Sequence, residues 1–99
     1  MSSKTKTVTP VVEAPEDTGG KPGHGFQVIL HNDDVNVAEY VVACLIRIFG
    51  HPAVLAAKIM LEAHRTGRAI AQVEAEGPAR EHAAQLHACG LRATVESIA

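Results

Sequence analysis

The sequence predicts an α+β fold, a small antiparallel three-stranded sheet with three helices packed on one face. Two observations predict it. Segments with the three- and four-residue apolar spacing of helices are interspersed with short runs of strand-forming residues, in the order strand, helix, helix, strand, helix, strand. The 99 residues leave room for one domain. A short chain with this order of elements favours a sheet whose helices gather on one side.

The first two elements meet at a polar turn. Residues Phe26–Leu30 are apolar and partly β-branched, and the strand that they predict stops at the turn formers of residues 31–34. Apolar residues then recur at helical spacing over Val37–Phe49. We expect Asn36 to be the N-cap of this amphipathic helix and Gly50 to end it.

Proline and glycine mark the remaining elements. Pro52 suits the first position of a second, longer helix, which continues to Gly67. Alternation over Ala69–Ala75 predicts a short strand. Pro78 then opens a third helix that runs to Cys89, and a last strand follows over residues 91–98.

The chain divides in composition near residue 24. Residues 1–24 are rich in Ser, Thr, Pro, Gly and Lys, and their prolines and glycines interrupt any helix, so we expect a disordered N-terminal extension before a folded domain over residues 25–99. The extension lacks the Arg-rich amphipathic pattern and the apolar core of targeting peptides. The sequence therefore predicts a cytoplasmic protein.

Composition argues against several classes of protein. The net charge is −2, the basic residues form no stripe, and aromatic residues make up only 3% of the chain, so we expect no binding of nucleic acid. A hydrophobic fraction of 46% is that of an ordinary globular protein rather than a membrane protein. The six histidines have no zinc-binding spacing, and no nucleophile motif is present. We therefore expect neither an enzyme nor a bound cofactor or metal.

The chain contains two cysteines, Cys44 and Cys89, in segments that read as helical. Their separation is not that of metal ligands. We interpret them as reduced core thiols, and a disulfide between them, although geometrically possible, is the less favoured state in the cytosol.

Three stretches of the sequence together resemble the ClpS family of adaptors. They are residues 28–34 (VILHNDD) with 39–41 (EYV), residues 56–64 (AAKIMLEAH) with 67–69 (GRA), and residues 93–96 (ATVE). The resemblance extends from about residue 26 to the end of the sequence. It implies a monomeric adaptor that recognises N-degrons, the free and usually large hydrophobic first residues of N-end rule substrates. The adaptor would present them to the N-terminal domain of a Clp AAA+ ATPase for degradation, with the N-terminal extension engaging the ATPase.

The resemblance also assigns the residues of the binding site. Asn32, Asp33 and His64 match the family positions that hold the substrate's α-amino group. The positions that line the pocket for its first side chain correspond here to Asn36, Ala38, Val41, Ala63 and Val95.

The chemistry of the three polar residues suits an amine. A free α-amino group has a pKa of about 7.7 to 8.0 and is mostly a cation at neutral pH, so its site needs acceptor oxygens and negative charge. Asn32 offers a carbonyl oxygen, Asp33 a charge, and neutral His64 a ring nitrogen. A protonated His64 would repel the ligand, so we expect binding to weaken in acid.

Four positions depart from the family pattern. Ala38 stands where the family commonly has a methionine that gates the pocket, and Val37 where it has a proline. Gly77 and His82 replace an acidic residue and a lysine at the start of the third helix, on the surface that faces the ATPase. The likeness is therefore stronger at the pocket than at the ATPase-facing surface.

Each site residue also has an ordinary structural interpretation. Asn-Asp-Asp after a strand is typical of turns, His64 suits the C-terminal end of a helix, and small apolar residues belong in a core. The alternative hypothesis is a protein-protein interaction domain of the same fold, as in the C-terminal domain of a ribosomal stalk protein, without amine recognition. Binding of a peptide with a free N-terminal leucine separates the two hypotheses.

Overall fold

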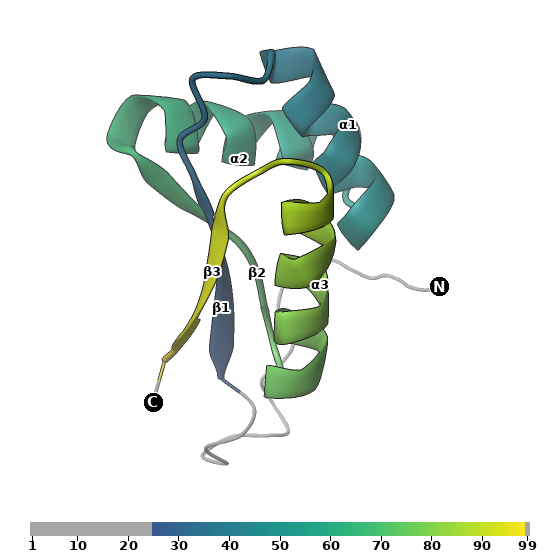
Figure 1. Cartoon of the computed structure of the whole chain (residues 1–99), viewed down its shortest axis with the longest axis vertical. Coiled ribbons are helices and arrows are strands. Elements are labelled where there is room, and N and C mark those ends of the chain that lie inside the picture. The colour runs from purple at the N-terminus through teal and green to yellow at the C-terminus, as the bar shows by residue number, and fades with distance from the viewer. Residues whose placement is uncertain (1–24, 99) are drawn as a thin grey trace.

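The computed structural model describes residues 25–98, and the predicted extension over residues 1–24 lies outside them. The predicted α+β order is confirmed (Figure 1). The elements are β1 (Phe26–His31), α1 (Ala38–Phe49), α2 (Ala53–Thr66), β2 (Arg68–Glu74), α3 (Glu76–Ala88) and β3 (Ala93–Ser97).

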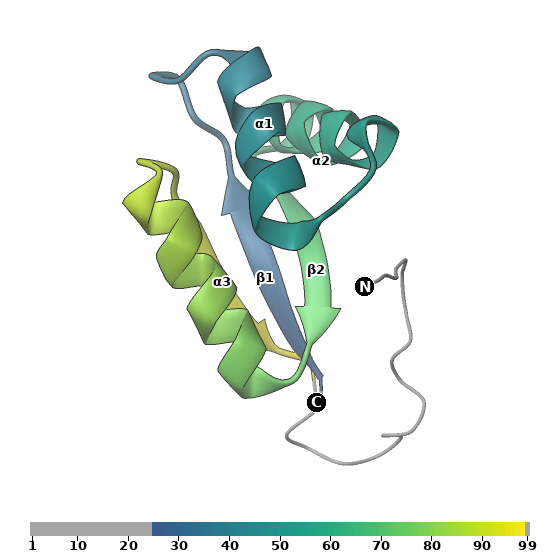
Figure 2. The ribbon, with the colours of Figure 1, turned by 90° about the vertical axis from the view of Figure 1, so that its right-hand side faces the viewer.

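The sheet has the order β2-β1-β3, and both outer strands run antiparallel to β1. Leu30 on β1 pairs with Ala69 on one side and Ala93 on the other. The register with β2 shifts between Val28 and Ile29, so that Ala71 is the extra residue of a β-bulge. All three helices cover the same face of this sheet, which Figure 2 shows from the side of the helices.

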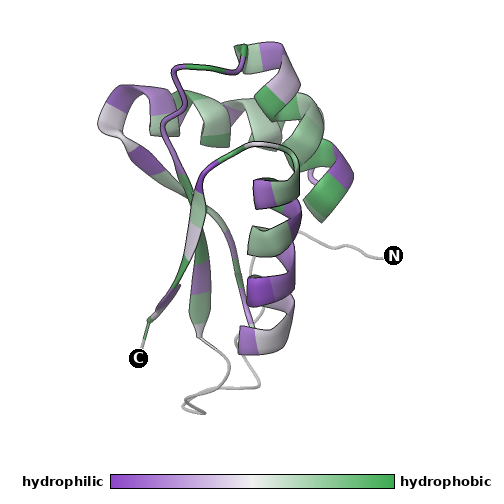
Figure 3. Cartoon of the chain, in the orientation of Figure 1, coloured by the Kyte–Doolittle hydropathy of each residue, from purple (hydrophilic) through white to green (hydrophobic). Residues whose placement is uncertain are grey.

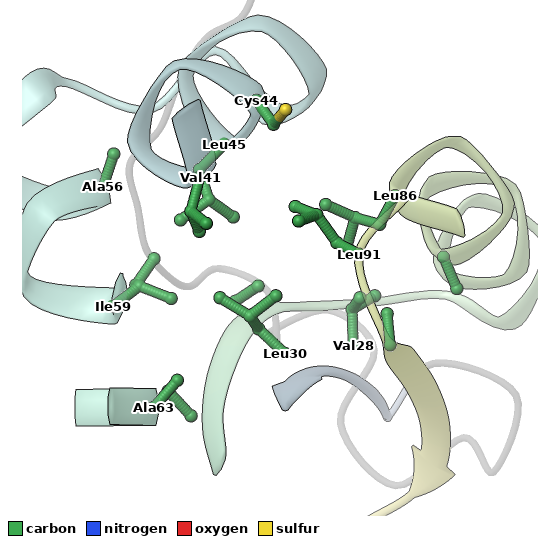
Figure 4. Close-up of a cluster of buried hydrophobic side chains, with 14 of the residues drawn as sticks. Val28, Leu30, Val41, Cys44, Leu45, Ala56, Ile59, Ala63, Leu86 and Leu91 are labelled. Atoms are coloured by element: carbon green, nitrogen blue, oxygen red, sulfur yellow. The ribbon is translucent and has the colours of Figure 1, made fainter. Parts of the chain in front are cut away.

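The core lies between that face and the helices. Figure 4 shows its side chains, which converge from β1, all three helices and the segment before β3. Helix α3 contributes mainly small residues and Leu86 to the core, and Figure 3 shows hydrophilic residues along its length. The fully buried side chains of greatest volume are Ile29, Leu30, Leu45, Leu86, Val28 and Cys44.

The predicted C-terminal ends of α1 and α2, at glycine residues, are confirmed. The starts of α1 and α3 differ from those predicted. Gly50 and Gly67 take left-handed conformations with φ of 75° and 99°, which an L side chain disfavours. Helix α1 begins one residue later than expected, with Val37 at the N-cap, because the Asn36 side chain bonds elsewhere. Helix α3 begins two residues before Pro78, since a proline in the first turn breaks no helical hydrogen bond.

A histidine is buried where α1, α2 and β2 meet. His51 is only 8% exposed, and its Nε2 lies 2.8 Å from the carbonyl oxygen of the bulge residue Ala71. Its ring stacks on Phe49 at a centroid distance of 5.1 Å, and His82 contacts Phe49 at 4.8 Å. His82 Nδ1 in turn lies 2.6 Å from a Glu74 carboxylate oxygen. We call these four side chains, His51, Phe49, His82 and Glu74, the histidine cluster.

Burial lowers the pKa of His51 more than the Ala71 carbonyl and the charge of Glu74 raise it, and the nearby His82 lowers it further. The ring is therefore neutral at neutral pH, and Nε2–H donates to the Ala71 carbonyl.

Among residues 25–98, no helix has the length and apolarity that crossing a membrane requires.

Candidate functional site

The loop between β1 and α1 is folded around the Asp33 carboxylate. Oδ1 accepts hydrogen bonds from the backbone N–H groups of Val35 at 2.7 Å and Asn36 at 3.0 Å, and Oδ2 accepts one from Asn36 Nδ2 at 2.6 Å. The first two bonds form the local turn that Asp residues favour. The Asn36 side chain, then the two backbone N–H groups and the charge of Arg92, lower the pKa of Asp33 against the opposing effect of burial. The carboxylate is therefore charged at neutral pH.

Contacts from distant parts of the chain fix the two ends of this loop. The Asn32 backbone N–H donates to the Gly67 carbonyl at 2.9 Å, and the Asn32 carbonyl accepts from Arg92 Nη2 at 2.7 Å. Asn36 Nδ2 also donates to the Gly90 carbonyl at 3.2 Å. The loop thus has its position set by the ends of α2 and α3 as well as by its own sequence.

A pocket of about 280 Å³ opens beside the loop. Its floor is apolar and comprises Leu30, Val41 and Ala63, which are 1%, 5% and 3% exposed. Its rim is polar and comes from two segments, the loop on one side and His64 in the last turn of α2 on the other. The pocket is therefore a small apolar hollow with hydrogen-bonding groups around its mouth.

Seven of the eight predicted site residues line this pocket. They come from three places in the sequence, which the fold brings together: Asn32, Asp33, Asn36, Ala38, Val41, Ala63 and His64. Ala38 is the first residue of α1 and is exposed at the mouth.

Val95, the eighth predicted residue, is not among the residues that line the pocket, and its role in binding stays a prediction. It pairs with Val28 in the middle of the sheet, whereas Leu30 on the pocket floor pairs with Ala93. The two-residue offset along β3 moves Val95 about 7 Å away from the loop on the same face. There its half-buried side chain packs against the hydrophobic core.

Four lining residues were not predicted, namely Leu30, His31, Asp34 and Met60. Met60 lies one helical turn before His64, so helical periodicity alone points it to the same side of α2. Leu30 was assigned only to the strand, and His31 only to the polar turn that follows it. The His31 ring also has a partner of its own, Thr94 Oγ1 at 2.8 Å.

This arrangement suits a cation attached to an apolar group. A charged carboxylate, an amide and an imidazole surround the mouth, and the floor below them is apolar. Within residues 25–98, no three His, Cys, Asp or Glu side chains are grouped so as to hold a metal ion.

The sequence matches a family model described as "ATP-dependent Clp protease adaptor protein ClpS" over residues 21–94. The chloroplastic Clp protease adapter protein CLPS1 of Arabidopsis thaliana is 43% identical over 72 residues, which are 72% of this chain and 45% of that protein. The ClpS adapter protein of Leptothrix cholodnii is 33% identical over 103 aligned positions, covering 92% of this chain and 90% of that protein. Some relatives are longer, and the match spans only 58% of the ClpS protein of Syntrophus aciditrophicus.

The fold also matches a solved structure, Agrobacterium tumefaciens ClpS2 bound to L-phenylalaninamide. The TM-score is 0.73 at 27% sequence identity, and the match covers 76% of this chain and 98% of that one.

Proposed function

This chain belongs to the ClpS family of ATP-dependent Clp protease adaptor proteins, and we propose that its pocket binds the free N-terminal large hydrophobic residue of N-degron proteins. In this role the chain is a binding module without catalytic activity of its own. Delivery of the bound substrate to a Clp AAA+ ATPase completes the proposed function.

The observation that carries the proposal is the polar rim over an apolar floor. Asp33 and His64 stand on opposite segments around the mouth, and Val41 and Ala63 lie below them. An N-terminal residue has the same two parts, a cationic amine and an apolar side chain on one carbon. A ligand whose amine stays at the rim can place its side chain on the floor.

The bonding of Asp33 leaves it able to accept an amine. An ionised carboxylate has about four lone-pair sites. The two loop N–H groups and the Asn36 amide occupy three of them. The remaining site accepts the ammonium group, with a charge-assisted hydrogen bond, while the other three bonds keep the carboxylate in place.

The ligand of the matching solved structure agrees with this chemistry. L-phenylalaninamide, bound to Agrobacterium tumefaciens ClpS2, has a free α-amino group, an aromatic side chain and no following residue. It contains only the parts that the rim and the floor are proposed to recognise, and it is therefore a suitable competitor for tests on this chain.

The test is fluorescence anisotropy with labelled peptides that begin with leucine or phenylalanine. We expect a free-amine peptide to bind and to be displaced by L-phenylalaninamide, and its N-acetylated twin to bind at least about tenfold more weakly, because acetylation removes the cation. Equal binding of the two peptides, or no binding of either, would instead support the interaction domain without amine recognition.

The delivery step rests on family membership, and so do the proposed monomeric state, the ATPase N-terminal domain as partner and the cytoplasmic location. The two departures at the ATPase-facing surface differ in their local structure. Gly77 is exposed and offers no side chain, whereas His82 is turned toward Glu74 with 23% of its side chain exposed. Because Gly77 is exposed, the loss of an acidic side chain at this position, rather than the change at His82, would alter the surface that contacts an ATPase.

A further inference from the structure

The two cysteines of the chain face each other across the gap between α1 and the end of α3. Tyr40, Cys44 and Arg47 are four and three residues apart on α1, so their side chains share one face of that helix. The Tyr40 hydroxyl donates to the Cys89 carbonyl at 2.6 Å, and Arg47 Nη2 donates to the Cys89 sulfur at 2.9 Å. Because residues on both sides of Cys44 reach Cys89, Cys44 lies opposite it.

The two thiols differ in exposure and in charge environment. Cys44 is fully buried, and Figure 4 shows its sulfur on the side of α1 that faces α3. Burial, followed by the contact with the Cys89 thiol, raises the pKa of Cys44. Cys89 is half-buried, so an oxidant can reach it, and its sulfur accepts a hydrogen bond from the Arg47 guanidinium at 2.9 Å. Cys89 is thus suited to attack an oxidant, and Cys44 to react afterwards.

We propose that Cys44 and Cys89 form a redox modification site, which closes to an intramolecular disulfide in the presence of a hydroperoxide. In the first step the Cys89 thiolate attacks the peroxide oxygen, the O–O bond breaks, and a sulfenic acid forms with loss of hydroxide. In the second step the Cys44 sulfur attacks the sulfenic sulfur, the S–S bond forms, and water leaves as the Cys44 proton is lost. With hydrogen peroxide, two thiols are oxidised by two electrons and the peroxide is reduced to two waters.

The bond would form next to the pocket loop. Cys89 directly precedes Gly90, whose carbonyl accepts the Asn36 amide that also binds Asp33. A disulfide would therefore fasten the C-terminal end of α3 to α1 beside the loop that forms the pocket rim. Its formation is measured without any peptide, so its failure is distinguishable from failure of the proposed function.

The test uses the full chain, treated with hydrogen peroxide, alkylated with N-ethylmaleimide and weighed by intact mass spectrometry. We expect a loss of about 2 Da, no alkylation of either cysteine, and full reversal by dithiothreitol. The oxidised chain should remain a monomer on a non-reducing gel. Its melting temperature should rise by roughly 10 °C or more, because the crosslink closes a long loop of the unfolded chain.

Variants separate the roles of the three residues. Cys89→Ser should leave Cys44 unreactive, and Cys44→Ser should stop the oxidation of Cys89 at the sulfenic acid or at a disulfide between two molecules. Cys44→Ala serves as a second variant if the buried hydroxyl prevents folding. Arg47→Met should slow disulfide formation about threefold to tenfold, while Arg80→Met, which removes an exposed arginine on α3, should leave the rate unchanged.

Two results would overturn the proposal. One is that both cysteines of the peroxide-treated wild-type chain are still alkylated, although the Cys89→Ser or Cys44→Ser chain shows that a single thiol does react with peroxide. The other is oxidation that yields only disulfides between molecules. Equal rates in the Arg47→Met and Arg80→Met chains would overturn the assignment of Arg47 as the activating residue.

Discussion

The loop around Asp33 and the histidine cluster both place an ionisable side chain among hydrogen-bonding partners, with opposite results. Asp33 is only partly buried, and three N–H groups hold it in its charged form. His51 is almost fully buried, and burial holds it in its neutral form although its single described bond, to the Ala71 carbonyl, favours the charged form. Both pKa values are lowered, but hydrogen bonds to the charged form are the main cause at Asp33 and burial is the main cause at His51.

The difference separates a group that can bind a ligand from one that supports the fold. Asp33 keeps a lone pair at the mouth of a pocket, where a cation can reach it. His51 lies between a stacked phenylalanine and a backbone carbonyl, without access for a ligand. A lowered pKa is therefore no sign of function by itself, and its cause and its access to solvent decide which role it has.

The largest expected effect is on ligand binding, and it tests whether the charged Asp33 carboxylate binds the ligand. Asp33→Asn retains an oxygen that can accept the loop N–H groups, and it removes the charge. We expect the affinity for a peptide with a free N-terminal leucine to fall tenfold to a hundredfold, the loss of about 1.5 to 3 kcal/mol that a charge-assisted hydrogen bond is worth. Anisotropy titration measures this effect.

The matched control is Asp34→Asn, which removes the same charge one residue further along. Asp34 is exposed and accepts a hydrogen bond only from the Asn32 amide among the described contacts. Its loss should weaken peptide binding less than threefold, an effect of about 0.6 kcal/mol. If both variants lose affinity equally, general negative charge at the rim explains binding and the specific geometry of Asp33 does not.

A smaller effect is expected on stability, at the histidine cluster. His51→Ala leaves the Ala71 carbonyl without its donor and should reduce the free energy of unfolding at neutral pH by about 1 to 2 kcal/mol, with peptide affinity unchanged in the folded protein. Urea unfolding followed by circular dichroism measures the loss. A variant as stable as the wild type would show that the buried ring contributes only packing that alanine can replace.

The same histidine predicts how stability depends on pH. Its pKa is lower in the folded chain than the value of about 6.5 expected in the unfolded chain, so the unfolded chain binds more protons between the two values. The contribution of His51 is complete above about pH 6.5 and is lost as the pH falls toward the folded pKa. Unfolding midpoints should therefore decrease in mild acid, less steeply in His51→Ala than in a chain with the exposed His64 replaced by Asn.

The smallest expected effect concerns selectivity at the pocket mouth. Ala38 has only a methyl group at the position where the resemblance to the family implies a methionine, so we expect a β-branched first residue to meet little crowding. Peptides that begin with Ile or Val should bind within about tenfold of the Leu peptide, a gap of about 1.4 kcal/mol, and Ala38→Met should weaken them selectively. If they bind a hundredfold worse than the Leu peptide and Ala38→Met changes nothing, Ala38 does not set the selectivity.

Most of the fold could be predicted from local patterns. The strand at Phe26 and the glycine ends at Gly50 and Gly67 depend on periodicity and on positive φ, which the nearby sequence specifies. The start of α1 could not be predicted in this way. Asn36 is a good N-cap by residue type, but its amide binds Asp33 and the Gly90 carbonyl, 54 residues away. That contact exists only once α3 has packed beside the loop.

In the candidate site, too, features set by the local sequence could be predicted, and features set by tertiary packing could not. The stretches around Asn32 and His64 are recognisable by their resemblance to a family, and the fold brings them to one pocket. The distance of Val95 from the loop could not be predicted, because it depends on the register of β3 with β1, and a two-residue shift of that register changes it by about 7 Å. The opposition of Cys44 and Cys89 likewise depends on how α3 packs against α1, and the spacing of the two residues in the sequence does not contain it.

The central position of β1 has a consequence for how the chain folds. Among residues 25–98, β1 pairs with two strands that follow much later in the sequence, and its loop end is joined to β3 by contacts such as His31 to Thr94, 63 residues apart. Pairings this distant in sequence slow folding, because the chain must lose the entropy of closing a long loop before the contacts form and stabilise it. Until β3 has been synthesised, β1 has an unpaired edge that a second nascent chain could join. The early helical pair α1 and α2 is the part of the molecule that can form first and cover the apolar face of β1 during that interval.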